Sequence, residues 1–153
     1  MSPSLQPTSK YPDERGYYIP LFNQMTGVNV SYSKEGVIRG MHFQEGKCAQ
    51  AKTVHVLDGL IEDVVLDLRT RQVYSFIMKE GDTLYVPRGY AHGFEALTDS
   101  RIIYGVDNFY YPSAERIIRY DTIDHKWKRK LPTLSYKDAN AKSIDEVLMG
   151  GQE

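Results

Sequence analysis

The feature that most constrains the fold of this chain is a series of short apolar runs between Gly16 and Tyr111, each ended by glycine or by charged turn residues. The runs alternate or stay apolar and are rich in Val, Ile, Tyr and Phe, which is the pattern of β-strands. They read VNVSYS, GVIRGMHF, AKTVHVLDG, LIEDVVLDLR, VYSFIMKEGD, TLYVPRG, AHGFEAL and RIIYGVDNFYY. Short strands at this even spacing predict an all-β sandwich or barrel rather than βαβ units.

The two ends of the chain have a different character. The first residues are polar and rich in proline, which is typical of an arm or an irregular entry segment. Near the other end, Ser143 and Glu146 form a capping box ahead of the apolar run of SIDEVLM, which predicts a short helix. SAERIIRY (113–120) is a weaker candidate for one helical turn. We therefore expect an N-terminal arm, a barrel and a C-terminal helical tail at residues 1–15, 16–141 and 142–153.

Composition excludes several classes of protein. The chain has 153 residues and 17.6 kDa, which suits one domain with one core. A formal net charge of −1 gives no reason to expect nucleic acid or an anionic membrane as partner. No apolar run approaches the roughly 20 residues of a membrane span, and the N-terminus has no apolar signal segment. The single cysteine, Cys48, rules out an internal disulfide and predicts a reducing, cytoplasmic location.

Two glycine- and histidine-containing stretches carry the first resemblance to a known fold. GDTLYVPRGYAH (81–92) has the spacing G-x5-P-x-G-x2-H, which resembles the second motif of the cupin barrels. The stretch 36–59, from GVIRGMHF to VLDG, resembles the companion motif. The resemblance implies a cupin-like jelly-roll barrel whose strands carry His42 and His92 towards the interior.

The metal-ligand positions of these motifs hold unusual residues. Where metal-bearing cupins have three histidines and a carboxylate, this chain has His42, Gln44, Lys52 and His92. Glutamine is a poor ligand for Zn or Fe, and the ammonium of Lys52 would repel a cation. We therefore predict a site without a metal or other cofactor. A fixed positive charge inside a barrel would instead suit a developing oxyanion.

A second resemblance covers most of the chain, from Asp13 to about Ala141. Its motifs are DERG (13–16), RGMHFQ (39–44), QAK (50–52), DVVLDLR (63–69), VPRGYAHGF (86–94), NFYYP (108–112) and LSYKDA (134–139). On these motifs the chain resembles the dTDP-4-dehydrorhamnose 3,5-epimerases. The resemblance implies a dimeric, metal-free barrel whose substrate is a nucleotide-linked 4-keto-6-deoxyhexose, with dTDP as the expected nucleotide in deoxysugar biosynthesis.

The resemblance also assigns catalytic roles. A 4-keto group makes the C3 and C5 hydrogens acidic, so inversion needs a base, an oxyanion stabiliser and an acid on the other face. By resemblance His42 is the base, Asp138 orients it, and Tyr104 is the acid. Lys52, with His92, would stabilise the enolate oxygen. Histidine as a residue type changes its charge near neutral pH, and a carboxylate partner fixes its tautomer, which agrees with this assignment.

Further positions match the substrate-binding side of the family: Arg15, Arg39, Asn29, Tyr18, Gln44 and Tyr110. Guanidinium groups suit a diphosphate. Tyr18 would stack on the base, and Tyr110 is the reserve candidate for the acid. Because the arm segment SKYPDERGYY carries Arg15 and Tyr18, we expect a homodimer in which each arm is exchanged onto the partner barrel.

The chain also departs from the family pattern. The apolar strand expected before DERG is missing, and a hairpin between DLR and VPRG is shorter than expected. Pro20 stands where the family has a glutamate, and Gly27 replaces a glutamine. These changes lie on the nucleotide side, so the chemistry is expected to be retained while the nucleotide and the sugar stay open.

Two other functions remain as alternatives. A nucleotide-sugar 3,4-ketoisomerase would use the same barrel and the same acidic hydrogens, although RGMHFQ argues against it. A non-catalytic barrel that binds a sugar nucleotide would keep the pocket without the chemistry. The sequence does not decide whether C3, C5 or both centres are inverted.

Overall fold

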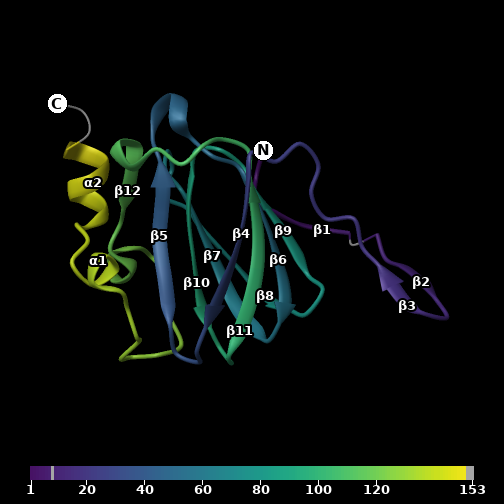
Figure 1. Ribbon diagram of the computed structural model, residues 1–153. Coiled ribbons are helices and arrows are strands. Elements are labelled where there is room, and N and C mark those ends of the chain that lie inside the picture. The colour runs from purple at the N-terminus through teal and green to yellow at the C-terminus, as the bar shows by residue number, and fades with distance from the viewer. Residues whose placement is uncertain (8, 151–153) are drawn as a thin grey trace.

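The computed structural model describes residues 1–7 and 9–150, which form two five-stranded antiparallel sheets that face each other (Figure 1). The first sheet has the order β1-β9-β6-β11-β4, with bounds Ser4–Gln6, Thr83–Val86, Lys52–Asp58, Ser100–Val106 and Gly27–Ser33. The second has the order β12-β5-β10-β7-β8, with bounds Glu115–Ile117, Ile38–Gln44, Tyr90–Ala96, Leu60–Asp67 and Val73–Lys79. The predicted all-β, cupin-like jelly-roll barrel is confirmed.

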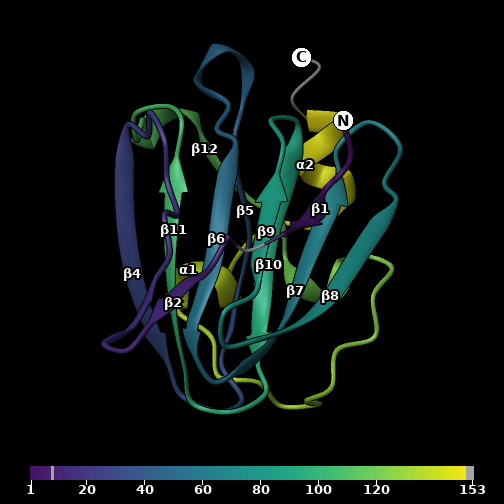
Figure 2. The same cartoon turned by 90° about the vertical axis from the view of Figure 1, so that its right-hand side faces the viewer.

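Each of the eight apolar runs in the sequence overlaps one of the strands from β4 to β11. Alternate residues of these strands point between the sheets, where their burial stabilises the fold. The core between the sheets consists of Val54, Val56, Ile61, Val65, Met78, Leu84, Val86, Phe94 and Ile102. Figure 2 shows β4, β11, β6 and β9 side by side, with β4 at the edge of its sheet.

The C-terminal segment covers the outer face of the second sheet. Helices α1 (Tyr136–Ala139) and α2 (Ile144–Gly150) lie there, and Ile144 packs in a second apolar cluster with Met41 and Leu66 (Figure 1). The predicted capping box and short helix are confirmed, because Glu146 N donates to Ser143 Oγ at 3.2 Å and Ser143 N donates to Glu146 Oε1 at 3.3 Å. The last three residues of the predicted tail, 151–153, lie outside the described residues.

The helical turn predicted over 113–120 is wrong. A 3₁₀ turn η2 (Pro112–Ala114) is followed at once by strand β12, which pairs with β5. Glu115, Arg116 and Ile117 pair with the edge of β5, and this pairing outweighs weak helical propensity. The other two 3₁₀ turns in the described part of the chain are η1 (Gly46–Cys48) and η3 (Tyr120–Thr122).

The N-terminal segment differs from the sequence-based expectation in one respect. A strand does precede DERG: the three residues of β1 pair with β9, so the expectation that this strand is missing is wrong. Strands β2 (Tyr11–Asp13) and β3 (Gly16–Tyr18) form a separate hairpin that projects away from the barrel (Figure 1). The predicted arm boundary at residues 15 and 16 falls inside this hairpin. Across the described residues, no helix has the length and apolar character needed to cross a membrane.

Candidate active site

A pocket of about 410 Å³ opens between the two sheets at one end of the barrel. A smaller hollow of about 70 Å³ lies beside it, and His42, Lys52 and Tyr104 line both. Of the other predicted residues, the pocket adds Asn29, Gln44 and Tyr110, and the hollow adds Arg39 and His92. Most of the predicted site residues are therefore brought together.

His42 is paired with Asp138. The ring Nε2 lies 2.7 Å from Asp138 Oδ1, and Asp138 Oδ2 accepts a hydrogen bond from Gly40 N at 3.0 Å. Asp138 sits in α1, where its own N–H donates to the Ser135 hydroxyl that caps the helix. Burial works to raise the pKa of Asp138, but the hydrogen bond and charge of His42, the Gly40 N–H and the charge of Arg39 outweigh it and hold the pKa below its ordinary value.

His92 is paired with Asp63, a residue that the sequence did not suggest for the site. The ring Nε2 lies 2.7 Å from Asp63 Oδ2, and both side chains are buried. The second oxygen of Asp63, Oδ1, has no hydrogen-bond partner in the described part of the protein. Burial raises the pKa of Asp63, although His92 and the charge of Lys52 oppose the shift.

The two histidines lie directly opposite each other on neighbouring strands, because β10 and β5 pair His92 with His42. Next to this pair the strands approach unusually closely at an irregularity between His92 and Phe94. A Cβ at Gly40, whose φ is +125°, would lie only 2.7 Å from the Cα of Gly93. The glycines of RGMH and AHGF are therefore required for the close approach that places both rings in the site.

Lys52 and Tyr104 face the same space from the other sheet. Lys52 is the first residue of β6, and burial of its ammonium lowers its pKa, while the charges of Asp63 and Glu115 oppose that shift. Tyr104 lies in β11, where burial raises the pKa of the phenol and the charge of Arg39 opposes the shift. The inward orientation predicted for Lys52 is present, with a cation and a phenol opposite the two histidines.

Arg39 and Asn29 connect the site to the sheet edge. Arg39 donates from Nε to Ser33 Oγ at 2.8 Å and from Nη2 to Tyr32 O at 2.9 Å, so it joins β5 to the edge strand β4. Asn29 pairs across β4 and β11 with Tyr104 and lines the pocket. Two of the guanidinium nitrogens are thus engaged within the protein, and Nη1 is the one for which no hydrogen bond is found in the described residues.

Glu115 is a second site residue that the sequence did not suggest. Its Oε1 lies 3.8 Å from His42 Nδ1, and its Oε2 accepts from Tyr110 Oη at 2.7 Å and from Lys137 Nζ at 3.4 Å. Burial works to raise the pKa of Glu115, but the Tyr110 hydrogen bond and the charges of Lys137 and His42 lower it overall. Its position follows from β12, so reading 113–120 as a helical turn concealed it.

Arg15 and Tyr18 are not brought to the pocket of their own chain. Both lie on the projecting β2–β3 hairpin, where Arg15 pairs with Asp13 and Tyr18 is 67% exposed. In the described part of the chain, no group of three or more His, Cys, Asp or Glu side chains is placed to hold a metal ion.

Comparison with known proteins agrees with this geometry. The family model described as dTDP-4-dehydrorhamnose 3,5-epimerase matches residues 5–146. A protein of that description from Salmonella typhimurium is 34% identical, with 90% of this chain and 87% of the relative covered. The crystal structure of the Bacillus anthracis protein with TDP and PPi bound is 30% identical, with a TM-score of 0.86 over 92% of this chain and 93% of that one.

A third comparison concerns the protein from Legionella pneumophila, solved in complex with dTDP-4-keto-L-rhamnose. It is 28% identical, with a TM-score of 0.84, and the match covers 94% of this chain and 88% of that chain. The sequence-based prediction of an epimerase, an enzyme of the isomerase class, is confirmed by these matches. The chain belongs to the dTDP-4-dehydrorhamnose 3,5-epimerase family.

Proposed function

We propose that this protein inverts C3, C5 or both in a dTDP-linked 4-keto-6-deoxyhexose, through an enolate and without a metal, in cytoplasmic deoxysugar biosynthesis. The observation that carries the proposal is the convergence of two His–Asp pairs, Lys52 and Tyr104 on the pocket and the hollow beside it. Gln44 and Lys52 at the metal-ligand positions support the metal-free chemistry.

His42 is the base of the proposed reaction. Asp138 accepts the proton on Nε2 and fixes the tautomer, so Nδ1 is the nitrogen that takes a proton from carbon. The lowered pKa of Asp138 keeps its carboxylate charged, and this charge stabilises the imidazolium that forms. A carbon next to the keto group of the bound sugar would have to face Nδ1.

Lys52 and His92 stabilise the negative charge that develops on the C4 oxygen. Both line the hollow beside the pocket, and groups already fixed in position stabilise a developing oxyanion without reorganisation. Asp63 holds the His92 ring through Nε2, and the ring's other nitrogen stabilises the enolate oxygen as a donor, which requires that this nitrogen carry a proton. This arrangement puts a cation and an imidazole where the enolate oxygen forms.

Tyr104 returns a proton to the opposite face of the sugar. It stands on β11, in the sheet that faces the two histidines of β5 and β10. A raised pKa keeps the phenol protonated and able to donate. Arg39 and Asn29 line the same space and would contact the polar groups of the substrate.

The binding residues Arg15 and Tyr18 act in the pocket of a partner subunit. Their hairpin projects from its own barrel, and Val28, Val30 and Tyr32 leave an exposed apolar stripe on edge strand β4. A homodimer with exchanged arms would cover apolar surface and complete the site. Mixing Arg15→Ala and His42→Ala subunits tests this, because a mixed dimer regains one site with an intact arm and an intact base. Mixtures that stay as inactive as the separate variants would contradict arm exchange.

The activity itself is tested by incubation with dTDP-4-keto-6-deoxyglucose in deuterated water, with NMR to locate the deuterium. Incorporation at C3, at C5 or at both, together with an inverted product, is expected. Incorporation without inversion but with a keto group moved to C3 would identify a ketoisomerase. Tight binding without any incorporation would identify a non-catalytic sugar-nucleotide-binding barrel.

A further inference from the structure

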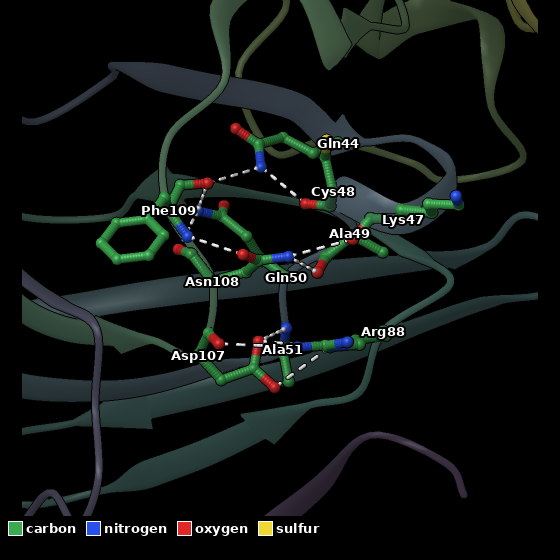
Figure 3. Close-up of polar contacts among 10 residues, drawn as sticks. All are labelled: Gln44, Lys47, Cys48, Ala49, Gln50, Ala51, Arg88, Asp107, Asn108 and Phe109. Atoms are coloured by element: carbon green, nitrogen blue, oxygen red, sulfur yellow. Dashed lines mark hydrogen bonds and ion pairs between the residues drawn. The ribbon is translucent and has the colours of Figure 1, made fainter.

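The rim of the pocket beside Gln44 is held by side-chain amides. This rim is the segment that follows β11, residues 107–111, and it passes along the loop 45–51. Figure 3 shows glutamine and asparagine side chains between the rim and the loop. Within the described residues, no backbone–backbone hydrogen bond joins residues 108–110 to any strand of the barrel. The position of this rim therefore depends on side chains.

Gln44 makes the central contacts. Its Nε2 donates to Phe109 O at 3.0 Å and to Cys48 O at 2.6 Å (Figure 3). Its Oε1 accepts from Tyr111 N at 2.8 Å. Gln44 as a residue is 7% exposed. Three of its four hydrogen-bonding capacities are used within the protein, and the amide pairs with residues 109 and 111 as a neighbouring strand would. This leaves Gln44 little capacity to bind a substrate directly.

A second layer repeats the arrangement one residue earlier. Gln50 Nε2 donates to Asn108 O at 2.9 Å, and Asn108 Nδ2 donates back across the gap to Lys47 O at 3.1 Å and Ala49 O at 3.3 Å. The side-chain oxygen of Asn108, Oδ1, accepts from Phe109 N at 2.9 Å. The rim and the loop are thus joined from both sides.

The base of the rim is fixed by Asp107. Its Oδ1 accepts from Ala51 N at 2.7 Å, and its Oδ2 lies 3.1 Å from Arg88 Nε. Ala51 directly precedes Lys52, so the same contacts fix the start of the strand that carries the cation. The network joins the residues before Lys52 to the residues before Tyr110.

The rim carries groups that face the reacting centre. Phe109 and Tyr110 line the pocket, and the Tyr110 hydroxyl donates to Glu115 Oε2 at 2.7 Å. The other oxygen of Glu115 lies 3.8 Å from His42 Nδ1, the nitrogen left free by Asp138. A continuous set of contacts therefore runs from Gln44 through the rim to the carboxylate beside the base.

We propose that Gln44 is a positioning residue that sets the affinity for the nucleotide sugar. It does so by holding residues 108–111 of the rim, and with them Tyr110, against the pocket. This inference rests on the proposed function for the identity of the ligand, but the mechanical part of it, a rim held by Gln44, does not. Gln50 supports the same segment and is expected to give a smaller effect of the same kind.

The first test measures the rim itself by hydrogen–deuterium exchange with mass spectrometry. Gln44→Met keeps the length of the side chain and removes its hydrogen bonds, so peptides that cover 107–111 should exchange faster than in the wild-type protein. Gln72→Met, at an exposed glutamine before β8, is the matched control and should leave the rim unchanged. Gln50→Met provides a second variant if Gln44→Met does not fold. Unchanged exchange in the rim of both Gln44→Met and Gln50→Met would overturn the proposal.

The second test separates binding from chemistry. Gln44→Met should raise KM, and the Kd for dTDP measured by calorimetry, about tenfold, while kcat falls less, because the base and the cation stay in place. In a Tyr110→Phe background the same change should have a much smaller effect on KM, since the tyrosine through which it acts is already impaired. Gln44→Glu keeps the acceptor for Tyr111 N, so its KM and its Kd for dTDP should lie between those of the wild-type protein and those of Gln44→Met.

The outcomes are distinguishable from a failure of the proposed function. If the wild-type protein has no epimerase activity, the rim exchange and the dTDP affinity still decide the role of Gln44. An unchanged KM and Kd in a folded Gln44→Met variant would overturn the positioning role. So would full additivity with Tyr110→Phe, because Gln44 would then act on the ligand or on the fold independently of the rim tyrosine.

Discussion

The site contains the same pair of side chains twice, in two different environments. His42 and Asp138, and His92 and Asp63, are each joined by a contact of 2.7 Å from Nε2 to a carboxylate oxygen. The His42 side chain is 36% exposed, whereas the His92 side chain is 9% exposed. The two carboxyl groups respond in opposite directions, with the pKa of Asp138 lowered and that of Asp63 raised.

The difference follows from what surrounds each carboxylate. Asp138 gains a backbone N–H and the charge of Arg39 in addition to its histidine, and these favour the charged form. Asp63 has an oxygen without a hydrogen-bond partner in the described residues, in a fully buried position. Because the two environments shift the two pKa values in opposite directions, the two pairs suit different roles. The more exposed pair, His42–Asp138, suits proton transfer, and the buried pair, His92–Asp63, suits a fixed orientation.

The largest effect is expected from the open pair. His42→Ala removes the base, so no carbanion forms, and both deuterium incorporation and inversion should fall by about 10²–10⁴-fold together. NMR of the substrate in deuterated water gives both rates in one experiment. If exchange continues at the wild-type rate, the base lies elsewhere, and the role of proton transfer has been given to the wrong pair.

A smaller effect is expected from the buried pair. His92→Asn keeps a polar side chain near the hollow but removes the imidazole that faces the enolate, and the loss of one oxyanion contact typically costs about 10²–10³-fold in kcat. Exchange and inversion should slow in equal proportion, because both pass through the enolate. A ratio of exchange to inversion that changes in this variant would show that His92 transfers a proton itself.

Sequence reasoning suggested both histidines, and Asp138 by resemblance, but it did not suggest Asp63. His42 and His92 stand in glycine-containing motifs whose spacing requires close strand approach, which is a local property of the chain. Asp63 lies in DVVLDLR, where a buried strand leaves no local mark that distinguishes a site carboxylate. Its role depends on the pairing of β7 with β10, which is a tertiary property.

Glu115 and Gln44 show the same limit in another form. The Glu115 side chain reaches the site because β12 pairs with the edge of β5. Local helical propensity instead predicted a helical turn at this position. Gln44 was expected to contact substrate because alternate strand residues share a face, and it does line the pocket. Two of its three amide partners, Phe109 O and Tyr111 N, lie 65 and 67 positions away along the chain, a separation that strand periodicity cannot predict.

Tyr104 sharpens the comparison between the pairs, because it stands across the pocket from His42. Tyr104→Phe keeps the packing of the ring and removes its proton, so inversion should fall by about 10²-fold, the lower end for a positioned acid, since water can enter the open pocket. Exchange should survive better than inversion, because His42 still takes and returns a proton on its own face. Inversion at the wild-type rate would make Tyr110 the candidate acid.

The smallest expected effect is on stability, where the two carboxylates should differ in sign. Asp138→Asn replaces a carboxylate whose charged form is favoured in the folded state, and it should lower the free energy of unfolding at pH 7 by about 1.5–3 kcal/mol, typical of a hydrogen bond to a charged group. Asp63→Asn removes a buried carboxylate whose charged form is disfavoured, so the folded protein should lose no stability at pH 7 or should gain some.

The pH dependence of these two variants tests the same difference more directly. The folded-state pKa of Asp138 lies below the ordinary value of 3.8, so its contribution is present above that value and is lost as the pH falls through the folded pKa. The folded-state pKa of Asp63 lies above 3.8, so the cost of its charge is full above the folded pKa and disappears as the pH falls towards 3.8. Urea unfolding of the wild type and both variants, from pH 7 downwards, should therefore show two stability differences of opposite sign that both shrink on acidification. Equal losses in the two variants at pH 7 would mean that the buried pair is as favourably charged as the open one, and the division of roles drawn from their environments would not hold.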